Sequence, residues 1–306
     1  MSLRMSRPTR ARKLRSVTVT IQTRDERTLD VHEAGDPVGF PVVFHHGTPA
    51  AGLPYAAHAA LAREQGIRLI GYDRPGYGSS TRAPGRRVAD CVADVSALAD
   101  ALGLDAFAAW GISGGGPHVL ACAALCDERL KAVASLAAVA PYGADGLDWL
   151  EGMGEENHVE FGKVLDGEQA LRAYCEIAAG EMLKAQPDEL VQVLDSLLGP
   201  EDKSVLTGRF AEYMLECDHH GLEHGVDGWV DDDFAFAEPW GFAVEDISRP
   251  LLLLHGEDDR FVPVSHGHWL AARIPGVEAR IDAADGHLTL FERRMREVNA
   301  WLLSHS

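Results

Sequence analysis

The residues with the clearest chemical potential are a serine, a group of three acids and a histidine, which follow one another along the chain. The serine, Ser113, stands in the run Gly111-Ile112-Ser113-Gly114-Gly115, after an apolar stretch and before a helical pattern. A serine hydroxyl is a weak nucleophile at neutral pH and needs a base directed at it. Gly111 and Gly115 allow a tight strand-to-helix turn that exposes the hydroxyl. We therefore predict that Ser113 is a nucleophile.

An earlier loop supplies the groups that a nucleophilic serine would need beside it. The run His45-His46-Gly47-Thr48-Pro49 ends another apolar stretch. Acyl transfer needs two N–H donors that are fixed before the negative charge develops on the oxygen. We expect these donors to be the backbone N–H groups of Thr48 and Gly114. We interpret His46 and Gly47 as supports of this loop, and His45 as a residue packed in the strand.

The acid and the histidine stand in two later loops. Glu257, Asp258 and Asp259 follow an apolar run, and any of them could hold an imidazole in the correct tautomer. His287 follows the last apolar run, and Gly286 permits the bend that would bring it toward the serine. The order serine, acid, histidine on successive strand-end loops selects His287 as the general base among 14 histidines.

The elements that must position these residues alternate along the chain. We expect strands at 16–24, 27–34, 41–46, 67–72, 106–110, 130–138, 250–254 and 278–283. We expect helices at 54–65, 88–102, 116–126, 264–273 and 290–303. Such alternation predicts an α/β fold with a mostly parallel eight-stranded sheet flanked by helices. All candidate residues fall after strands, at the edge of the sheet where ligands bind.

The segment 142–248 differs from the rest of the chain. It contains 26 acidic and 5 basic residues, against 21 and 23 elsewhere. Its patterns predict helices at 171–183, 190–198 and 205–215. We therefore predict an acidic helical cap at 142–248 and a core formed by 16–141 and 249–306. We interpret Asp231-Asp232-Asp233 as a solvated face, with a site for a cationic group as the alternative, and the cap aromatics as cap core rather than pocket lining.

Several of these motifs resemble those of the α/β-hydrolase superfamily. His46-Gly47-Thr48-Pro49 is similar to its H-G-x-P loop, and the run from Asp73 to Ser80 to its D-x-x-G-x-G-x-S loop. The run from Gly256 to Pro263 is similar to its G-x-x-D-x-x-V-P stretch, and Gly286-His287 to its histidine loop. The resemblance implies an α/β-hydrolase fold with an inserted helical cap. It also implies that Asp259 is the acid of a triad with Ser113 and His287.

The resemblance implies a serine hydrolase and leaves its substrate open. The leading hypothesis is cleavage of a small or medium carboxylic ester through an acyl-enzyme intermediate. The alternatives are a prolyl aminopeptidase-like peptidase, a carbon–carbon bond hydrolase and a non-catalytic ligand receptor. Haloalkane dehalogenases and epoxide hydrolases of this fold carry aspartate where this chain has Ser113, so both are disfavoured. At the corresponding loop this chain has Gly47-Thr48-Pro49, which departs from the H-G-G-P-G motif of prolyl aminopeptidases and weakens that alternative.

Composition narrows the range of partners and locations. The chain has 306 residues and a net charge of −19, which disfavours binding to nucleic acid or to a membrane surface. We interpret the basic residues 1–15 as a disordered tail. No apolar run reaches the roughly 18 residues of a membrane span. Five cysteines without a metal-binding spacing indicate a cytoplasmic protein that needs no metal or other cofactor. We expect a small-molecule substrate and a possible homodimer.

Overall fold

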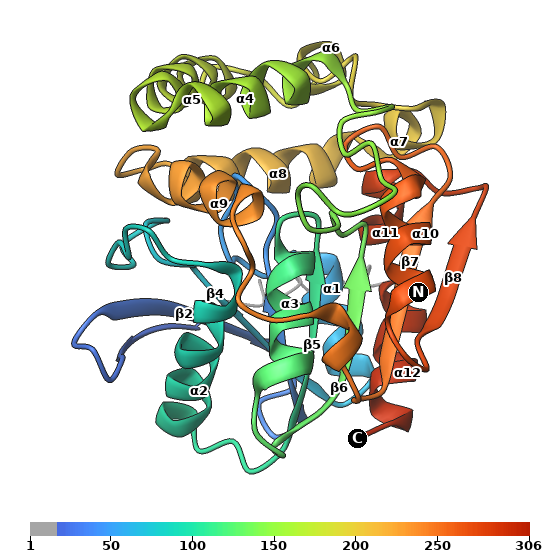
Figure 1. Cartoon of the computed structure of the whole chain (residues 1–306). Helices are drawn as coiled ribbons and strands as arrows, with labels where there is room; N and C mark the ends of the chain where they lie inside the picture. Colours follow the sequence, from blue (N-terminus) through green and yellow to red (C-terminus); the bar gives the residue numbers. More distant parts are fainter. Residues whose placement is uncertain (1–16) are drawn as a thin grey trace, which may run out of the picture.

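A single sheet of eight strands forms the centre of the molecule (Figure 1). The computed structural model describes residues 17–306, and the tail predicted for residues 1–15 lies outside them. The strand order is β1-β2-β4-β3-β5-β6-β7-β8, in which β2 runs antiparallel to β1 and β4 and the other neighbours are parallel. The predicted fold class is confirmed. The strands are Val17–Gln22, Thr28–Gly35, Phe40–His45, Ile67–Tyr72, Phe107–Ile112, Leu130–Leu136, Leu251–Gly256 and Glu278–Asp282.

Alternate side chains of the strands enter two separate hydrophobic clusters, one on each face of the sheet. In β3, Val43 belongs to one cluster and Val42 to the other, because successive side chains point to opposite faces. The first cluster packs against α2 (Cys91–Leu102), α3 (Gly115–Leu125) and α10 (Val264–Arg273). The second packs against α1 (Ala56–Glu64) and α12 (Met295–Ser304). No helix within residues 17–306 is long and apolar enough to cross a membrane.

A short helix before α2 and a divided helix at the C-terminal end complete the core. The second of these differs from the prediction. A short 3-10 helix, η1 (Val88–Asp90), leads into α2. The single helix predicted for 290–303 is two helices, α11 (His287–Arg293) and α12, with Arg294 between them. The first of these begins at the predicted base, so that His287 is placed by a helix start rather than by a loop.

The residues between β6 and β7 contain helices, and we call residues 142–248 the insert. Figure 1 shows α4, α5 and α6 as an outer layer, with α8 and α9 between them and the sheet. The helix predicted at 190–198 covers only Leu190–Val193, and the one predicted at 205–215 covers Gly208–Gly221. Three further helices, α4, α7 and α9, were not predicted. Whether the insert is a separate cap domain with these boundaries stays a prediction. The helices are Glu155–Asp166, Glu168–Met182, Leu190–Val193, Pro200–Val205, Gly208–Gly221 and Asp227–Ala237, numbered α4 to α9, followed by η2 (Val244–Asp246).

Candidate active site

Ser113 lies at a sharp turn between the buried strand β5 and the helix α3. Its φ of 54° is in the left-handed region, which few residues other than glycine adopt. The Ser113 N–H donates to the Leu136 carbonyl at 3.0 Å, and the Ser113 carbonyl accepts from the Gly116 N–H at 2.8 Å. These two bonds hold the turn, so that the half-buried serine stays at the carboxyl edge of the sheet.

Close packing explains the glycines on both sides of Ser113. A Cβ on Gly111 would overlap the Gly115 carbonyl, and a Cβ on Gly115 would overlap the His45 carbonyl. Both obstacles are backbone atoms, which cannot move aside unless β3 or α3 shifts. Glycine at 111 and 115 is therefore a steric requirement of this turn, as the sequence pattern predicted.

His287 and Asp259 are joined by a buried hydrogen bond. The His287 Nδ1–H donates to Asp259 Oδ2 at 2.8 Å. The other carboxylate oxygen of Asp259 accepts the N–H groups of Phe261 at 2.9 Å and Val262 at 2.8 Å, which fixes the carboxylate. Burial disfavours a charged imidazole, but the Asp259 carboxylate outweighs it and raises the pKa of His287 above its ordinary value. The pair can thus hold and stabilise an imidazolium.

The serine and the histidine line the same cavity. Ser113 and His287 both border a space of about 140 Å³, whose other walls are mostly apolar. The Phe261 ring stacks on the His287 ring with centroids 4.6 Å apart, which limits the rotation of the imidazole. Of the three competing acids, Asp259 is the one that contacts His287, while Glu257 is exposed. Of the three predicted triad residues, Ser113 and His287 thus line one cavity, and Asp259 lies behind His287 in contact with its ring.

The predicted oxyanion loop lies directly against the turn that carries Ser113. A Cβ on Gly114 would overlap the Thr48 side chain, and a Cβ on Gly47 would lie 3.5 Å from the Ser113 Cβ. Within residues 17–306, neither the Thr48 N–H nor the Gly114 N–H donates to another backbone carbonyl. His46 supports the loop, because its Nδ1–H donates to the Gly47 carbonyl at 2.8 Å. Two free amides therefore flank the serine.

A buried carboxylate of the insert fixes this loop from behind. Asp232 on α9 accepts hydrogen bonds from Thr48 Oγ1 at 2.7 Å, Tyr77 Oη at 2.8 Å and Arg74 at 2.6 Å. Arg86 Nη1 lies 2.7 Å from its other oxygen. Burial alone would raise the pKa of Asp232, but Arg74 and Arg86 hold it well below its ordinary value. The sequence carries no signal for this contact, because it joins residues far apart in the chain.

The prediction that Asp231–Asp233 form a solvated face is wrong. The three side chains are at most 5% exposed. Asp231 forms an ion pair with Arg82 at 2.8 Å. Burial and the neighbouring carboxyl of Glu160 on α4 raise the pKa of Asp233 well above its ordinary value. Consecutive helical residues point in three directions, so α9 turns each acid toward a different partner.

A second acid of the insert holds the start of the histidine helix. Asp202, in α7, accepts the backbone N–H groups of His287 at 2.8 Å, Leu288 at 2.9 Å and Thr289 at 3.0 Å. These are N–H groups of the first turn of α11, which have no partner inside the helix. Asp202 therefore serves as an N-cap supplied from another part of the chain. The sequence analysis missed it, because a capping acid is expected directly before its own helix.

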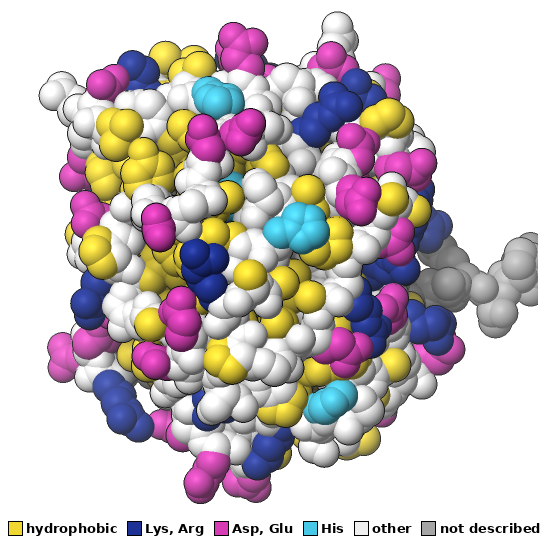
Figure 2. All heavy atoms as spheres, turned by 45° about the vertical axis from the view of Figure 1, so that its right-hand side comes forward, with side chains coloured by type: hydrophobic (Ala, Val, Ile, Leu, Met, Phe, Trp, Pro, Cys, Tyr) yellow, Lys and Arg dark blue, Asp and Glu magenta, His cyan; other side chains and the backbone are white. Residues whose placement is uncertain are grey.

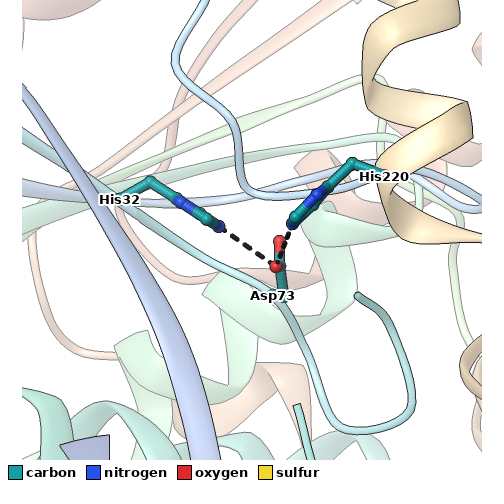
Figure 3. Close-up of side chains that lie close together, drawn as sticks. All are labelled: His32, Asp73 and His220. Atoms are coloured by element: carbon teal, nitrogen blue, oxygen red, sulfur yellow. Dashed lines mark hydrogen bonds and ion pairs between the residues drawn. The ribbon is translucent and has the colours of Figure 1, made fainter. Parts of the chain in front are cut away.

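One cluster in the structure could hold a metal ion, and it lies apart from the cavity. His32 Nε2 and His220 Nε2 donate to the same oxygen of Asp73, at 3.0 and 2.9 Å (Figure 3). The three groups lie within 4.8 Å of one another, as ligands of a transition metal would. Hydrogen bonds already satisfy them, and they join α8 to the loop after β4. The predicted absence of a metal cofactor stays a prediction.

The family of the chain follows from comparison with known proteins. The model of the alpha/beta hydrolase fold family matches residues 41–294. This match spans most of the chain, from β3 to α11, and contains Ser113, Asp259 and His287. The chain therefore belongs to the alpha/beta hydrolase fold family, and the predicted superfamily and enzyme class are confirmed.

Individual relatives include both esterases and haloperoxidases. A non-heme chloroperoxidase of Streptomyces lividans is 26% identical over 249 residues, covering 80% of this chain and 83% of that protein. A bifunctional esterase/perhydrolase of Acinetobacter calcoaceticus is 27% identical over 233 residues, covering 74% and 77%. A thermophilic esterase from Thermogutta terrifontis superimposes with a TM-score of 0.66 at 21% identity, covering 95% of this chain and all of that one. At that identity the structural likeness supports the fold alone.

Proposed function

We propose that this hydrolase cleaves small or medium carboxylic esters through an acyl-enzyme intermediate. The observation that carries the proposal is the Asp259–His287 hydrogen bond beside a cavity that Ser113 also lines. An acid-oriented imidazole next to a hydroxyl on a strained turn is the arrangement that activates serine for attack on a carbonyl. The apolar walls of the cavity suit an ester better than a highly polar substrate.

The proposed reaction has two halves. His287 takes the proton of Ser113 as the hydroxyl attacks the ester carbonyl, and Asp259 stabilises the imidazolium. The Thr48 and Gly114 N–H groups bind the negative oxygen of the tetrahedral intermediate. His287 then gives its proton to the leaving alcohol. Water, deprotonated by His287, releases the acid and restores Ser113.

The test compares turnover and covalent labelling in matched variants. Purified protein is offered p-nitrophenyl butyrate and a fluorophosphonate probe, alongside Ser113→Ala and the control Ser96→Ala on α2. We expect the control to match the unsubstituted chain. Ser113→Ala should lose the label and at least about a thousandfold in kcat/KM. Equal turnover or equal labelling of Ser113→Ala would refute the proposal.

The same experiment separates the alternative functions. A labelled Ser113 without ester turnover would direct attention to amides or to carbon–carbon bonds, and proline β-naphthylamide would test the aminopeptidase hypothesis. An unlabelled, inert Ser113 would favour a ligand receptor. Because one relative is named an esterase/perhydrolase, the assay also includes hydrogen peroxide in place of water. Peroxide attack on the acyl-enzyme would release a peracid and regenerate Ser113.

A further inference from the structure

Asp218, on α8, is a buried carboxyl group to which the described residues offer no counter-charge. The residue is 7% exposed, and within residues 17–306 no hydrogen bond or ion pair joins its carboxyl oxygens to another side chain or to the backbone. Burial alone raises the pKa of Asp218 to about 8. Burying an unpaired carboxyl costs free energy, and a folded chain usually satisfies such a group or uses it at a binding site.

The position of Asp218 indicates the use of this carboxyl. It lines the cavity of about 140 Å³ that Ser113 and His287 border. It also lines a second space of about 490 Å³ between α8 and the outer helices of the insert. Asp218 therefore stands where the two spaces adjoin, on the path from the outer helices to the nucleophile.

Other acidic side chains lie around these spaces. Glu160 and Asp233 border a third space of about 80 Å³, which Ser113 and Gly114 also line. Within residues 17–306, no lysine or arginine lines any of the three spaces. Figure 2 shows acidic side chains set around hydrophobic ones in the upper part of the molecule, where the insert lies. Burial disfavours the charged form of these acids, whereas a cation placed beside them favours ionisation, so a positively charged ligand would gain a carboxylate partner on binding.

The remaining walls suit the apolar body of a cation. Phe210, Tyr213 and Phe291 line the first space with Asp218, and their rings pack against one another. Aromatic faces attract alkylammonium groups, particularly where water is excluded. Val159 and Ile177 line the second space and are 44% and 66% exposed, so an apolar surface leads inward from the solvent.

We propose that Asp218 binds a positively charged nitrogen of the substrate, so that the preferred substrate is a hydrophobic ester that carries an ammonium group. This inference rests on the proposed ester hydrolysis and adds the charge of the substrate to it. Asp218 acts in recognition, whereas Ser113 and His287 carry out the chemistry.

Two pairs of esters with equal shape and different charge test the proposal. Choline butyrate is compared with 3,3-dimethylbutyl butyrate, which places the cation on the alcohol side. The p-nitrophenyl ester of 4-(trimethylammonio)butyric acid is compared with that of 5,5-dimethylhexanoic acid, which places it on the acyl side. We expect kcat/KM to favour the cationic ester at least about tenfold in one pair. Equal or inverse preference in both pairs would overturn the proposal.

Matched variants then assign the preference to Asp218. Asp218→Asn should bring the favoured ratio close to one, since the amide keeps the shape of the carboxyl and removes its charge. Both esters of a pair are measured on the same variant, so that a general change in activity cancels in the ratio. Glu216→Gln, at an exposed acid of the same helix, should keep the full ratio. A preference that survives Asp218→Asn would refute the role of this carboxyl.

A binding measurement keeps this inference distinct from the proposed reaction. Ser113→Ala protein should bind the cationic ester with a lower Kd than its neutral partner, and Ser113→Ala/Asp218→Asn should not. If the Kd values differ in this way but the unsubstituted protein hydrolyses neither ester, the proposed ester hydrolysis is refuted and the cation site stands. If the protein hydrolyses the esters but the Kd values are equal, the cation site is refuted and ester hydrolysis stands.

Discussion

The most demanding prediction concerns the buried carboxylate of Asp232. Substitution of Asp232 by Asn removes the negative charge and leaves nearly the same shape. Arg74, 1% exposed, and Arg86, 8% exposed, would then be buried cations without a counter-charge. Breaking a buried pair in this way costs about 3–5 kcal/mol. We therefore expect Asp232→Asn to lower the free energy of unfolding by about that amount.

A neighbouring aspartate provides the control. Asp231 pairs with Arg82, whose side chain is 28% exposed and has other acidic partners in Asp227 and Glu168. After this change Arg82 still reaches water and these two acids, so we expect the loss of the pair to cost roughly 1 kcal/mol. Urea unfolding at pH 7, followed by circular dichroism, gives both values under identical conditions. An Asp232→Asn cost below about 1 kcal/mol, or one no larger than that of Asp231→Asn, would refute the reasoning.

Four further predictions concern the proposed catalytic groups and their supports. Because Asp259 raises the pKa of His287 and only the neutral imidazole can take a proton, kcat/KM should fall on acidification with a midpoint above the ordinary value of 6.5, and a midpoint below it in the pH profile would contradict this. Asp259→Asn should lower kcat roughly 10⁴-fold in steady-state assays, with little change in circular dichroism. Gly114→Ala should lower kcat about 10²–10³-fold, because its Cβ meets Thr48 and displaces an oxyanion donor, and unchanged kcat would count against that donor. Asp202→Ala should cost about 1–2 kcal/mol in urea unfolding and also lower kcat, since α11 loses its cap, whereas a purely structural acid would leave kcat unchanged.

Local signals were enough to predict most of the core from the sequence. Each strand of the sheet is a short apolar or alternating run, and its burial depends mainly on that run. The turn at Ser113 was predictable for the same reason, because the glycines that it requires stand within two residues of it. The loop of His287 was recognisable from its place after the last strand.

Long-range partners explain what could not be predicted. Nothing near Asp232 in the sequence indicates that Arg74, 158 residues away, will meet it in the interior. A run of three acids is typical of a solvated surface when its partners are unknown. The sequence did not single out Asp218 either, because its proposed role depends on the two cavities that it lines in the folded chain. The helix boundaries in the insert were displaced where short apolar stretches fit more than one helical register.

The contact between Asp202 and the first turn of α11 has a consequence for engineering and for evolution. Part of the support of the His287 imidazole belongs to the insert, and so a foreign insert grafted between β6 and β7 would leave the start of α11 uncapped. An exchange of the whole insert would therefore change the cavity walls and also remove the cap of the helix that begins at His287. A chimera that keeps Pro200–Val205 and exchanges only α4, α5 and α6 would respect this dependence. In this chain, substrate specificity should then be easiest to change in the outer layer of helices, as long as Asn157 of α4 is kept, because its side chain donates to the carbonyl of Phe261, whose ring stacks on His287.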